Sequence, residues 1–456
     1  MENVKQNKMA DMPMKKLFWK MGLPMIISMV LQALYNVVDS IFVTNMGEQG
    51  AIANQALTLA FPIQILIIAI GVGTGIGLNT LLSKNLGENN KEQVNKVAGN
   101  GIFISICIFI LFFLFGMFGS KWFISLFSAG NEEIISMGTT YLKICCCFSL
   151  GSIAYTAYER FLQATGKTNL SAIAQISGAI ANIVLDYIFI FPLNMGVAGA
   201  AWATVIGQVV SGIMVILYLR KFKTVKLTKE KLRPHPHYIG RIVSLGMAPF
   251  FNQVSMMVVQ IVMNNVLIRY GAKSSYGSDI PLACAGIITK INMIFFAINI
   301  GISQGLQPII SYNYGARKLD RVREAYLKAA ISATIISTVS FICFQLFPRQ
   351  IIGIFGSESE AYFRFAEKFF RIFLFCTFIN GLQPITANFF TAIGKANRGI
   401  FLSLTRQVIF LLPLMIILPI FFGIEGVMFS APIADGFAAV CAITFAVKEL
   451  KSFQKL

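Results

Sequence analysis

Three acidic residues lie deep inside apolar runs of the sequence. Asp39 falls within YNVVDSIFV, Asp186 within NIVLDYIFIF, and Asp435 within the run 426–447. An ionised side chain in hydrocarbon is costly, so such a residue usually pairs with a neighbouring helix or serves an ion pathway. Two carboxylates that lie close together in a medium of low dielectric constant hold a proton or a cation between them. These positions are therefore the first candidates for chemistry.

The composition indicates a polytopic membrane protein. Hydrophobic residues make up 56% of the 456 residues and charged residues only 13%, whereas soluble domains carry about 25% charged residues. The net charge of +18 does not indicate nucleic-acid binding, because the basic residues cluster in alternate short loops. The eight cysteines lack metal-ligand spacing and the two histidines stand in a basic loop. We therefore expect no metal centre, no cofactor and no enzyme.

Twelve apolar runs are long enough to cross a bilayer core, which takes about 20 residues. They are 17–45, 54–83, 97–117, 135–160, 169–192, 197–220, 241–269, 282–312, 325–347, 362–391, 399–421 and 426–447. Lysine and arginine concentrate at both termini, after the second and eighth runs, and in 221–240, while NMGEQGAIA and PLNMGVAGA contain neither. The positive-inside rule then places both termini and the 221–240 loop in the cytoplasm.

An internal repeat divides the chain into two halves. GLNTLLSKNLGENNKEQV (77–94) aligns with GLQPIISYNYGARKLDRV (305–322), and FLQATGKTN (161–169) with FFTAIGKAN (389–397), both at an offset of 228. We predict an N-terminal six-helix lobe (1–220, the N-lobe), a cytoplasmic linker (221–240) and a C-terminal six-helix lobe (241–456, the C-lobe). Parallel repeats of this kind suit a transporter whose lobes rock around a central cavity.

Depth brings several polar side chains of the N-lobe together. Asp39 and Asp186 each lie six residues before the outer end of their run, roughly 9 Å deep. Asn182 is one turn from Asp186 on the same face, and Thr204 falls at a similar depth on the next run. Tyr35 is one turn from Asp39. We expect these five residues to form a site that exchanges a proton or binds Na⁺.

The C-lobe does not copy this site. Its helices instead carry the polar residues Lys290, Asn292, Arg406 and Asp435. The Cα depths of Arg406 and Asp435 differ by only about 6 Å, which an arginine side chain can span. We predict an ion pair or relay between them that extends toward Lys290. Its role is either gating or the neutralisation of two buried charges.

The sequence resembles the multidrug and toxic compound extrusion (MATE) transporters from end to end, in particular their MepA-like bacterial branch. The resemblance is carried by NVVDSIFV, RFLQATGKTN, NIVLDYIFIF followed by GVAGAAWATVIGQ, GLQPIISYNYGA and LTRQVIFLLPLMIILP. It implies an all-α fold of twelve transmembrane helices in two bundles, located in the inner (cytoplasmic) membrane of a bacterium. It also implies efflux of lipophilic, often cationic compounds driven by inward H⁺ or Na⁺. The family's cation site corresponds to Asp39, Asn182, Asp186 and Thr204, and Pro24 matches a proline that permits bending of the first helix.

Two other functions compete with antiport. A flippase for a lipid-linked precursor would need a strongly basic cavity, for which Lys290 and Arg406 are candidates, although the N-lobe is acidic. A membrane enzyme or receptor fits less well, because no nucleophile–base pattern is present. We expect a monomer in the lipid bilayer with small lipophilic substrates and no nucleic-acid partner. The 41 Phe and 19 Met suit an adaptable cavity.

Overall fold

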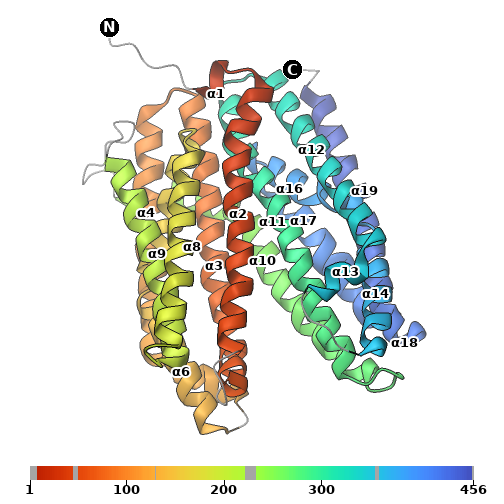
Figure 1. Ribbon diagram of the computed structural model, residues 1–456. Helices are drawn as coiled ribbons and strands as arrows, with labels where there is room; N and C mark the ends of the chain where they lie inside the picture. The colour runs from red at the N-terminus through yellow and green to blue at the C-terminus, as the bar shows by residue number, and fades with distance from the viewer. Residues whose placement is uncertain (1–7, 45–49, 129, 221–232, 355–358, 454–456) are drawn as a thin grey trace.

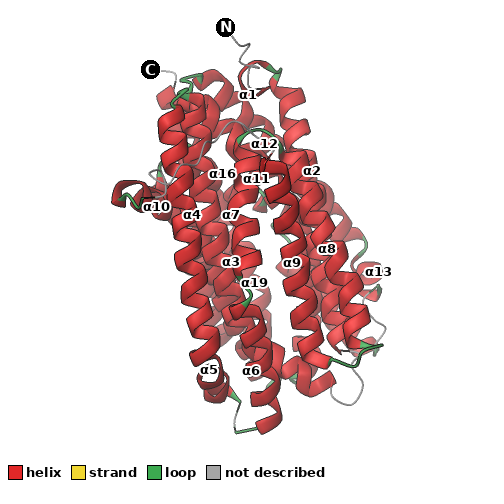
Figure 2. Cartoon of the chain, turned by 90° about the vertical axis from the view of Figure 1, so that its left-hand side faces the viewer, coloured by secondary structure: helices red, strands yellow, loops and turns green. Residues whose placement is uncertain are grey.

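The computed structural model describes residues 8–44, 50–128, 130–220, 233–354 and 359–453. In the first half of the chain the helices are α1 (Lys8–Asp11), α2 (Met14–Thr44), α3 (Gly50–Gly87), α4 (Lys91–Leu114), α5 (Ser120–Phe127), α6 (Glu132–Cys147), α7 (Leu150–Ala164), α8 (Thr168–Ile190) and α9 (Gly196–Arg220). In the second half they are α10 (Pro236–Gly271), α11 (Asp279–Gly315), α12 (Leu319–Leu346), α13 (Pro348–Gly353), α14 (Glu360–Phe373), α15 (Thr377–Asn380), α16 (Leu382–Ala392), α17 (Ala396–Leu404), α18 (Leu412–Phe422) and α19 (Ile424–Phe453). Two π-helical turns, η2 (Phe115–Gly119) and η4 (Thr405–Leu411), lie inside longer helices. The described residues form no strand, as Figure 2 also shows.

The predicted spans correspond to these helices. Ten described helices are long and apolar enough to cross a membrane, or twelve segments if each of two bent pairs is one span. The pairs are α6 with α7, bent by 42°, and α14 with the segment 377–392, bent by 44°. The all-helical architecture expected from the apolar runs is therefore confirmed.

The structure differs from the predicted spans in two details. The third run was expected to end at 117, but the helix continues through η2 to Phe127. Just beyond the predicted end, the hydroxyl of Ser120 donates to the carbonyl oxygen of Gly116 (2.8 Å), so this polar side chain is satisfied within the helix. The fourth and tenth runs were expected to be continuous. Local bonds stabilise their breaks, such as that from Thr377 Oγ1 to the carbonyl oxygen of Leu374 (2.7 Å), and hydropathy does not register such bonds.

The helices form two bundles, α2–α9 and α10–α19 (Figure 1). The described parts nearest both termini lie at the same end of the molecule, which we call the termini end. The ribbons of the bundles approach each other there and diverge toward the opposite end (Figure 1). Across the boundary α2 packs against α11, and α3 against α10.

Glycines allow the two bundles to touch through their backbones. A Cβ built on Gly77 would lie 2.0 Å from the carbonyl oxygen of Ile242, and one on Gly73 would lie 2.7 Å from that of Gly246. A Cβ on Gly305 would lie 2.6 Å from the Cα of Gly22. Side chains larger than hydrogen do not fit at such distances, a common feature of close helix contacts in membranes. The termini end is thus closed by direct helix-to-helix contact.

Candidate cation site and the polar interior

A polar stripe on α8 faces the interior of the N-lobe. Its buried members recur at helical spacing and are Ser171, Gln175, Gly178, Asn182 and Asp186. The opposite face carries exposed apolar residues such as Ile180 and Val184, which suit contact with lipid. Asn182 and Asp186 lie one turn apart, 4% and 0% exposed. The sequence-predicted pair therefore shares one buried helix face, as an i, i+4 spacing requires.

Close packing of α9 on α8 brings a third predicted residue to this face. A Cβ on Gly207 would lie 2.7 Å from the carbonyl oxygen of Gly178 and 2.9 Å from the Cβ of Asn182. One turn before Gly207, Thr204 Oγ1 accepts a hydrogen bond from Asn182 Nδ2 at 3.5 Å. Asn182 Oδ1 is buried without a hydrogen-bond partner among the described residues. The glycine contact is what places a hydroxyl beside the amide of Asn182.

The helix that carries Asp39 lies along α8. Gln175 of α8 donates a hydrogen bond to Gln32 of α2, and Tyr35, one turn further along α2, is half-buried. Asp39 belongs to α2, but its side chain lies outside the part of the chain that the structure describes. Its position beside Asp186, and the contribution of Tyr35, therefore stay predictions.

A small cavity adjoins Thr204. Its volume is about 30 Å³, and its polar lining includes Gln64, Ser149, Ser152, Thr204 and Gln208. Ser149 stands in the break between α6 and α7, and its buried Oγ has no hydrogen-bond partner within the described segments. A polar cavity of this size has room for about one water molecule. The hydroxyl of Thr204 therefore lies between the Asn182 amide and a space suited to a single small polar species.

In the C-lobe the predicted ion pair is present. Arg406 Nε donates to Asp435 Oδ1 at 2.5 Å, and Asn380 Nδ2 donates to Asp435 Oδ2 at 3.2 Å. The guanidinium also lies 5.2 Å from the centre of the Phe296 ring. Arg406 is part of the π-helical turn η4, a feature often found at functional sites. Arg406 and Asp435 are 7% and 3% exposed, so both charges are buried and paired.

The predicted extension of this network is not seen. Lys290 and Asn292 are half-buried on α11. Across the described segments neither makes a hydrogen bond or ion pair with Arg406 or Asp435. The network runs from Arg406 through Asp435 to Asn380.

Sequence reasoning missed a second polar cluster in the N-lobe. Glu159 is 3% exposed and accepts hydrogen bonds from Gln163 Nε2 (2.7 Å) and Ser171 Oγ (2.6 Å). Arg160 Nη1 donates to Gln163 Oε1 at 2.8 Å. Glu159 is therefore a buried carboxylate in addition to the three that the sequence analysis singled out, Asp39, Asp186 and Asp435. The signal was available, because Glu159 and Gln163 are polar residues at i, i+4 spacing where the fourth apolar run ends.

Glu449 is a further buried carboxylate, 2% exposed. It pairs with both Lys395 and Arg398, which belong to the turn between α16 and α17 and to α17. Glu449 lies just beyond the last predicted run, which ends at 447. In the structure α19 continues to Phe453 and carries the carboxylate back onto the C-lobe.

Two lobes of membrane-length helices, related by a parallel repeat and holding buried ionisable groups, define the architecture of a secondary transporter. The chain belongs to the MatE family, whose model matches residues 24–188 and 250–417. The family resemblance found in the sequence is thereby confirmed.

Curated relatives match almost the full length of the chain. The multidrug export protein MepA of Staphylococcus aureus is 24% identical over 432 residues, which cover 94% of this chain and 93% of that protein. MepA of Staphylococcus saprophyticus is 25% identical over 423 residues, covering 92% and 91%.

Solved structures share the fold. One is described as an outward-facing conformation of a multidrug resistance MATE family transporter of the MOP superfamily. It superposes with a TM-score of 0.91 at 23% identity and covers 100% of both chains. Another is a MOP superfamily transporter from Pyrococcus furiosus, whose title refers to a reverse polarity of the binding pocket. It has a TM-score of 0.89 at 23% identity, again over 100% of both chains. At this identity the likeness concerns the fold.

Proposed function

We propose that this protein is a multidrug efflux antiporter, which exports lipophilic, often cationic compounds in exchange for inward H⁺ or Na⁺. The observation that carries the proposal is the buried cluster of Asn182, Asp186 and Thr204. It places a carboxylate inside a bundle that spans the membrane, on the helix packed beside the one that carries Asp39. The names of the two staphylococcal relatives support the substrate class.

The chemistry of the cluster suits either coupling ion. A buried carboxylate can take up a proton, because burial disfavours its charged form. Carboxylate, amide and hydroxyl oxygens are equally suitable ligands for a small hard cation. The cavity beside Thr204 offers space for one such ion or its water. Uptake of the ion would change the charge of the N-lobe interior and thereby favour one arrangement of the lobes.

The orientation follows from the basic loops. With both termini in the cytoplasm of a bacterial cell, the closed termini end faces the cytoplasm and the diverging end faces outward. A cysteine at position 226, in the predicted linker outside the described residues, tests this. An impermeant thiol reagent added to intact cells should leave it unmodified, and efficient labelling would overturn the topology.

A flippase for a lipid-linked precursor is the second candidate. It would require unpaired basic groups for a pyrophosphate. The charge of Arg406 is compensated by Asp435 at 2.5 Å, which leaves Lys290 as the remaining basic candidate of the two. The ion pair therefore favours the antiporter over the flippase.

The decisive experiment is dye efflux from proteoliposomes after a pH jump, with and without Na⁺. Efflux driven by the pH gradient alone indicates H⁺ coupling, and efflux that needs a Na⁺ gradient indicates Na⁺ coupling. Absence of gradient-driven efflux of any cationic dye, together with translocation of a pyrophosphate-linked lipid, would replace the proposal by the flippase.

A further inference from the structure

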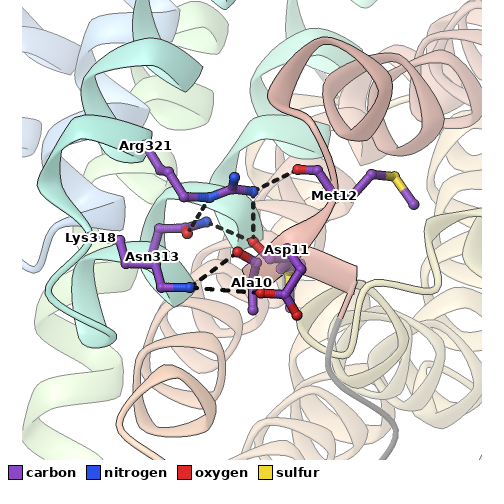
Figure 3. Close-up of polar contacts among 7 residues, drawn as sticks. Ala10, Asp11, Met12, Asn313, Lys318 and Arg321 are labelled. Carbon is purple, nitrogen blue, oxygen red and sulfur yellow. Dashed lines mark hydrogen bonds and ion pairs between the residues drawn. The ribbon is translucent and has the colours of Figure 1, made fainter.

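The segment that precedes α2 is held by the C-lobe. Figure 3 shows residues 9–12 lying against the turn that joins α11 and α12. Arg321 Nη2 donates to the carbonyl oxygens of Met9 (3.2 Å) and Met12 (2.8 Å). Asn313 Nδ2 also donates to the Met9 oxygen (3.2 Å), while its Oδ1 accepts from Arg321 Nε (3.0 Å). Lys318 Nζ donates to the Ala10 oxygen at 3.2 Å.

The local sequence explains why a carbonyl is available to the C-lobe. The helical partner of the Met9 oxygen would be the N–H four residues on, but that residue is Pro13, which has none. The carbonyl must therefore find a donor elsewhere, and Arg321 and Asn313 supply it. A guanidinium donor makes stronger hydrogen bonds than a neutral group.

An apolar anchor accompanies these bonds. The side chain of Met9 is 0% exposed and belongs to the same core cluster as Ile309, Tyr312 and Val322 of the C-lobe. The segment 9–12 is therefore attached both by its backbone and by a buried side chain. Further along, α2 packs against α8 and so belongs to the N-lobe. The chain thus passes from a segment held by the C-lobe directly into α2, which continues along the N-lobe.

Among the described residues, the other half of the repeat shows no such arrangement. The positions equivalent to Lys318 and Arg321 are Asn90 and Gln93, at the offset of 228. Asn90 Oδ1 caps its own helix by accepting the backbone N–H of Gln93 at 3.1 Å. Before α10, the backbone N–H of His235 donates to Asn100 Oδ1 of α4 at 2.7 Å, a single neutral bond. Within the described part of the chain, the charged attachment is therefore found before α2 and not before α10.

We propose that residues 9–12 and Arg321 form a latch that holds the termini end of the two lobes closed. The latch rests on the proposed function in one respect, since it acts on the alternation between closed and open lobes that transport requires. Separation of the lobes at this end pulls the start of α2 away from the α11–α12 turn. The bonds of Arg321 then break, so the latch favours the closed arrangement.

Cysteine reactivity at the lobe boundary tests the latch. Thr80 is 0% exposed and accepts a hydrogen bond across the boundary from Gln307 Nε2 at 2.8 Å. In a chain without its native cysteines, a Thr80→Cys residue reacts with a thiol reagent only in molecules whose boundary has opened. We expect Arg321→Gln to raise the modification rate of the cysteine at position 80 roughly tenfold. This is the effect of removing a charged hydrogen bond that stabilises the closed state but not the open state.

Arg323→Gln is the matched control, because it removes the same charge from an exposed position two residues further along α12. It should leave the rate unchanged. Arg321→Lys keeps the charge but loses the fork by which Nε bonds Asn313 while Nη2 bonds the two carbonyls, so it should raise the rate even if Arg321→Gln does not fold. Equal rates in the parent, the Arg323→Gln control and whichever Arg321 variant folds would overturn the latch.

The reactivity assay needs neither substrate nor an ion gradient. A protein that fails to export dye but reacts faster at position 80 after Arg321→Gln would refute the proposed function and retain the latch. A protein that exports dye but whose reactivity at position 80 is unchanged by Arg321→Gln would retain the proposed function and refute the latch.

Discussion

Gly178 and Gly207 in the N-lobe occupy the positions that Arg406 and Asp435 occupy in the C-lobe, 228 residues further on in each case. The helices that carry them also start 228 residues apart, at Thr168 and Ala396 and at Gly196 and Ile424. In the N-lobe the two glycines let α8 and α9 touch through their backbones. In the C-lobe an ion pair of 2.5 Å joins the corresponding helices.

This difference separates two uses of a buried carboxylate. The ion pair fixes Asp435 beside a permanent cation, and a buried charge pair is costly to break. The glycine contact instead brings Thr204 to Asn182, one turn from the buried carboxylate of Asp186 on the same face of α8. We therefore expect Asp186 to change its charge during transport and Asp435 to keep it.

The strongest test of this distinction removes the charge from the N-lobe. We expect Asp186→Asn and Asp39→Asn each to reduce pH-driven dye efflux to the level of protein-free liposomes, because an amide keeps the shape but neither exchanges a proton nor balances a cation. Expression and thermal stability should remain close to those of the parent protein. Asp279→Asn, at an exposed position, is the matched control and should pump normally. Wild-type efflux by both of the first two variants would remove the basis for the cation site.

Substitutions in the Arg406–Asp435 pair of the C-lobe should change the stability of the protein rather than the coupling of efflux to the ion. Arg406→Gln or Asp435→Asn alone should lower the free energy of unfolding by about 3–5 kcal/mol, because each leaves an uncompensated buried charge. The double variant should lose less than the sum of the two single losses. Thermal unfolding in detergent measures the cycle, and additive losses would show that the two side chains do not act on one another.

The glycine contact can be broken directly. A Cβ at Gly207 would press on Gly178 and Asn182, so Gly207→Ala should cost about 1–3 kcal/mol of stability. It should also reduce efflux, since it moves Thr204 away from Asn182. At Gly212 on the same helix the nearest atom to a new Cβ is 3.4 Å away, an ordinary contact. Gly212→Ala is therefore the control, and equal effects of the two substitutions would argue against a special role for the Gly178–Gly207 contact.

The smallest effect is expected at the hydroxyl itself. Thr204→Val removes the acceptor of one long hydrogen bond and should cost about 0.5–1.5 kcal/mol, seen as a few-fold higher ion concentration for half-maximal efflux. Thr204→Ser keeps the hydroxyl and should restore the parent value. If valine and serine behave alike, the hydroxyl takes no part in ion binding.

Much of the fold was predictable because the bilayer imposes one length on every span. The repeat between 77–94 and 305–322 then defined two lobes. Helical spacing placed Asn182 with Asp186, and depth placed Arg406 near Asp435. Each of these predictions follows from the rise and the periodicity of a helix together with the thickness of the bilayer.

Other features depend on local chemistry that a hydropathy pattern does not contain. The break near Ser149 arises from backbone hydrogen bonds of a single turn. Glu159 and Glu449 lie where apolar runs end. At such a position, an error of a few residues in the predicted helix end decides whether the side chain is expected in solvent or in the core. The attachment of Arg321 to Met9 depends on backbone carbonyls, which sequence letters do not display.

The glycine-lined boundary between the lobes also bears on kinetics. Interlocked side chains must change rotamer before two surfaces part, and close packing makes such unlocking slow. Where Gly73 meets Gly246, backbone meets backbone, so fewer side chains have to rearrange there than in a fully interlocked interface. We expect this backbone contact to lower the activation barrier for opening. We therefore expect the latch to determine how many molecules are open, and this smooth seam to determine how fast they exchange.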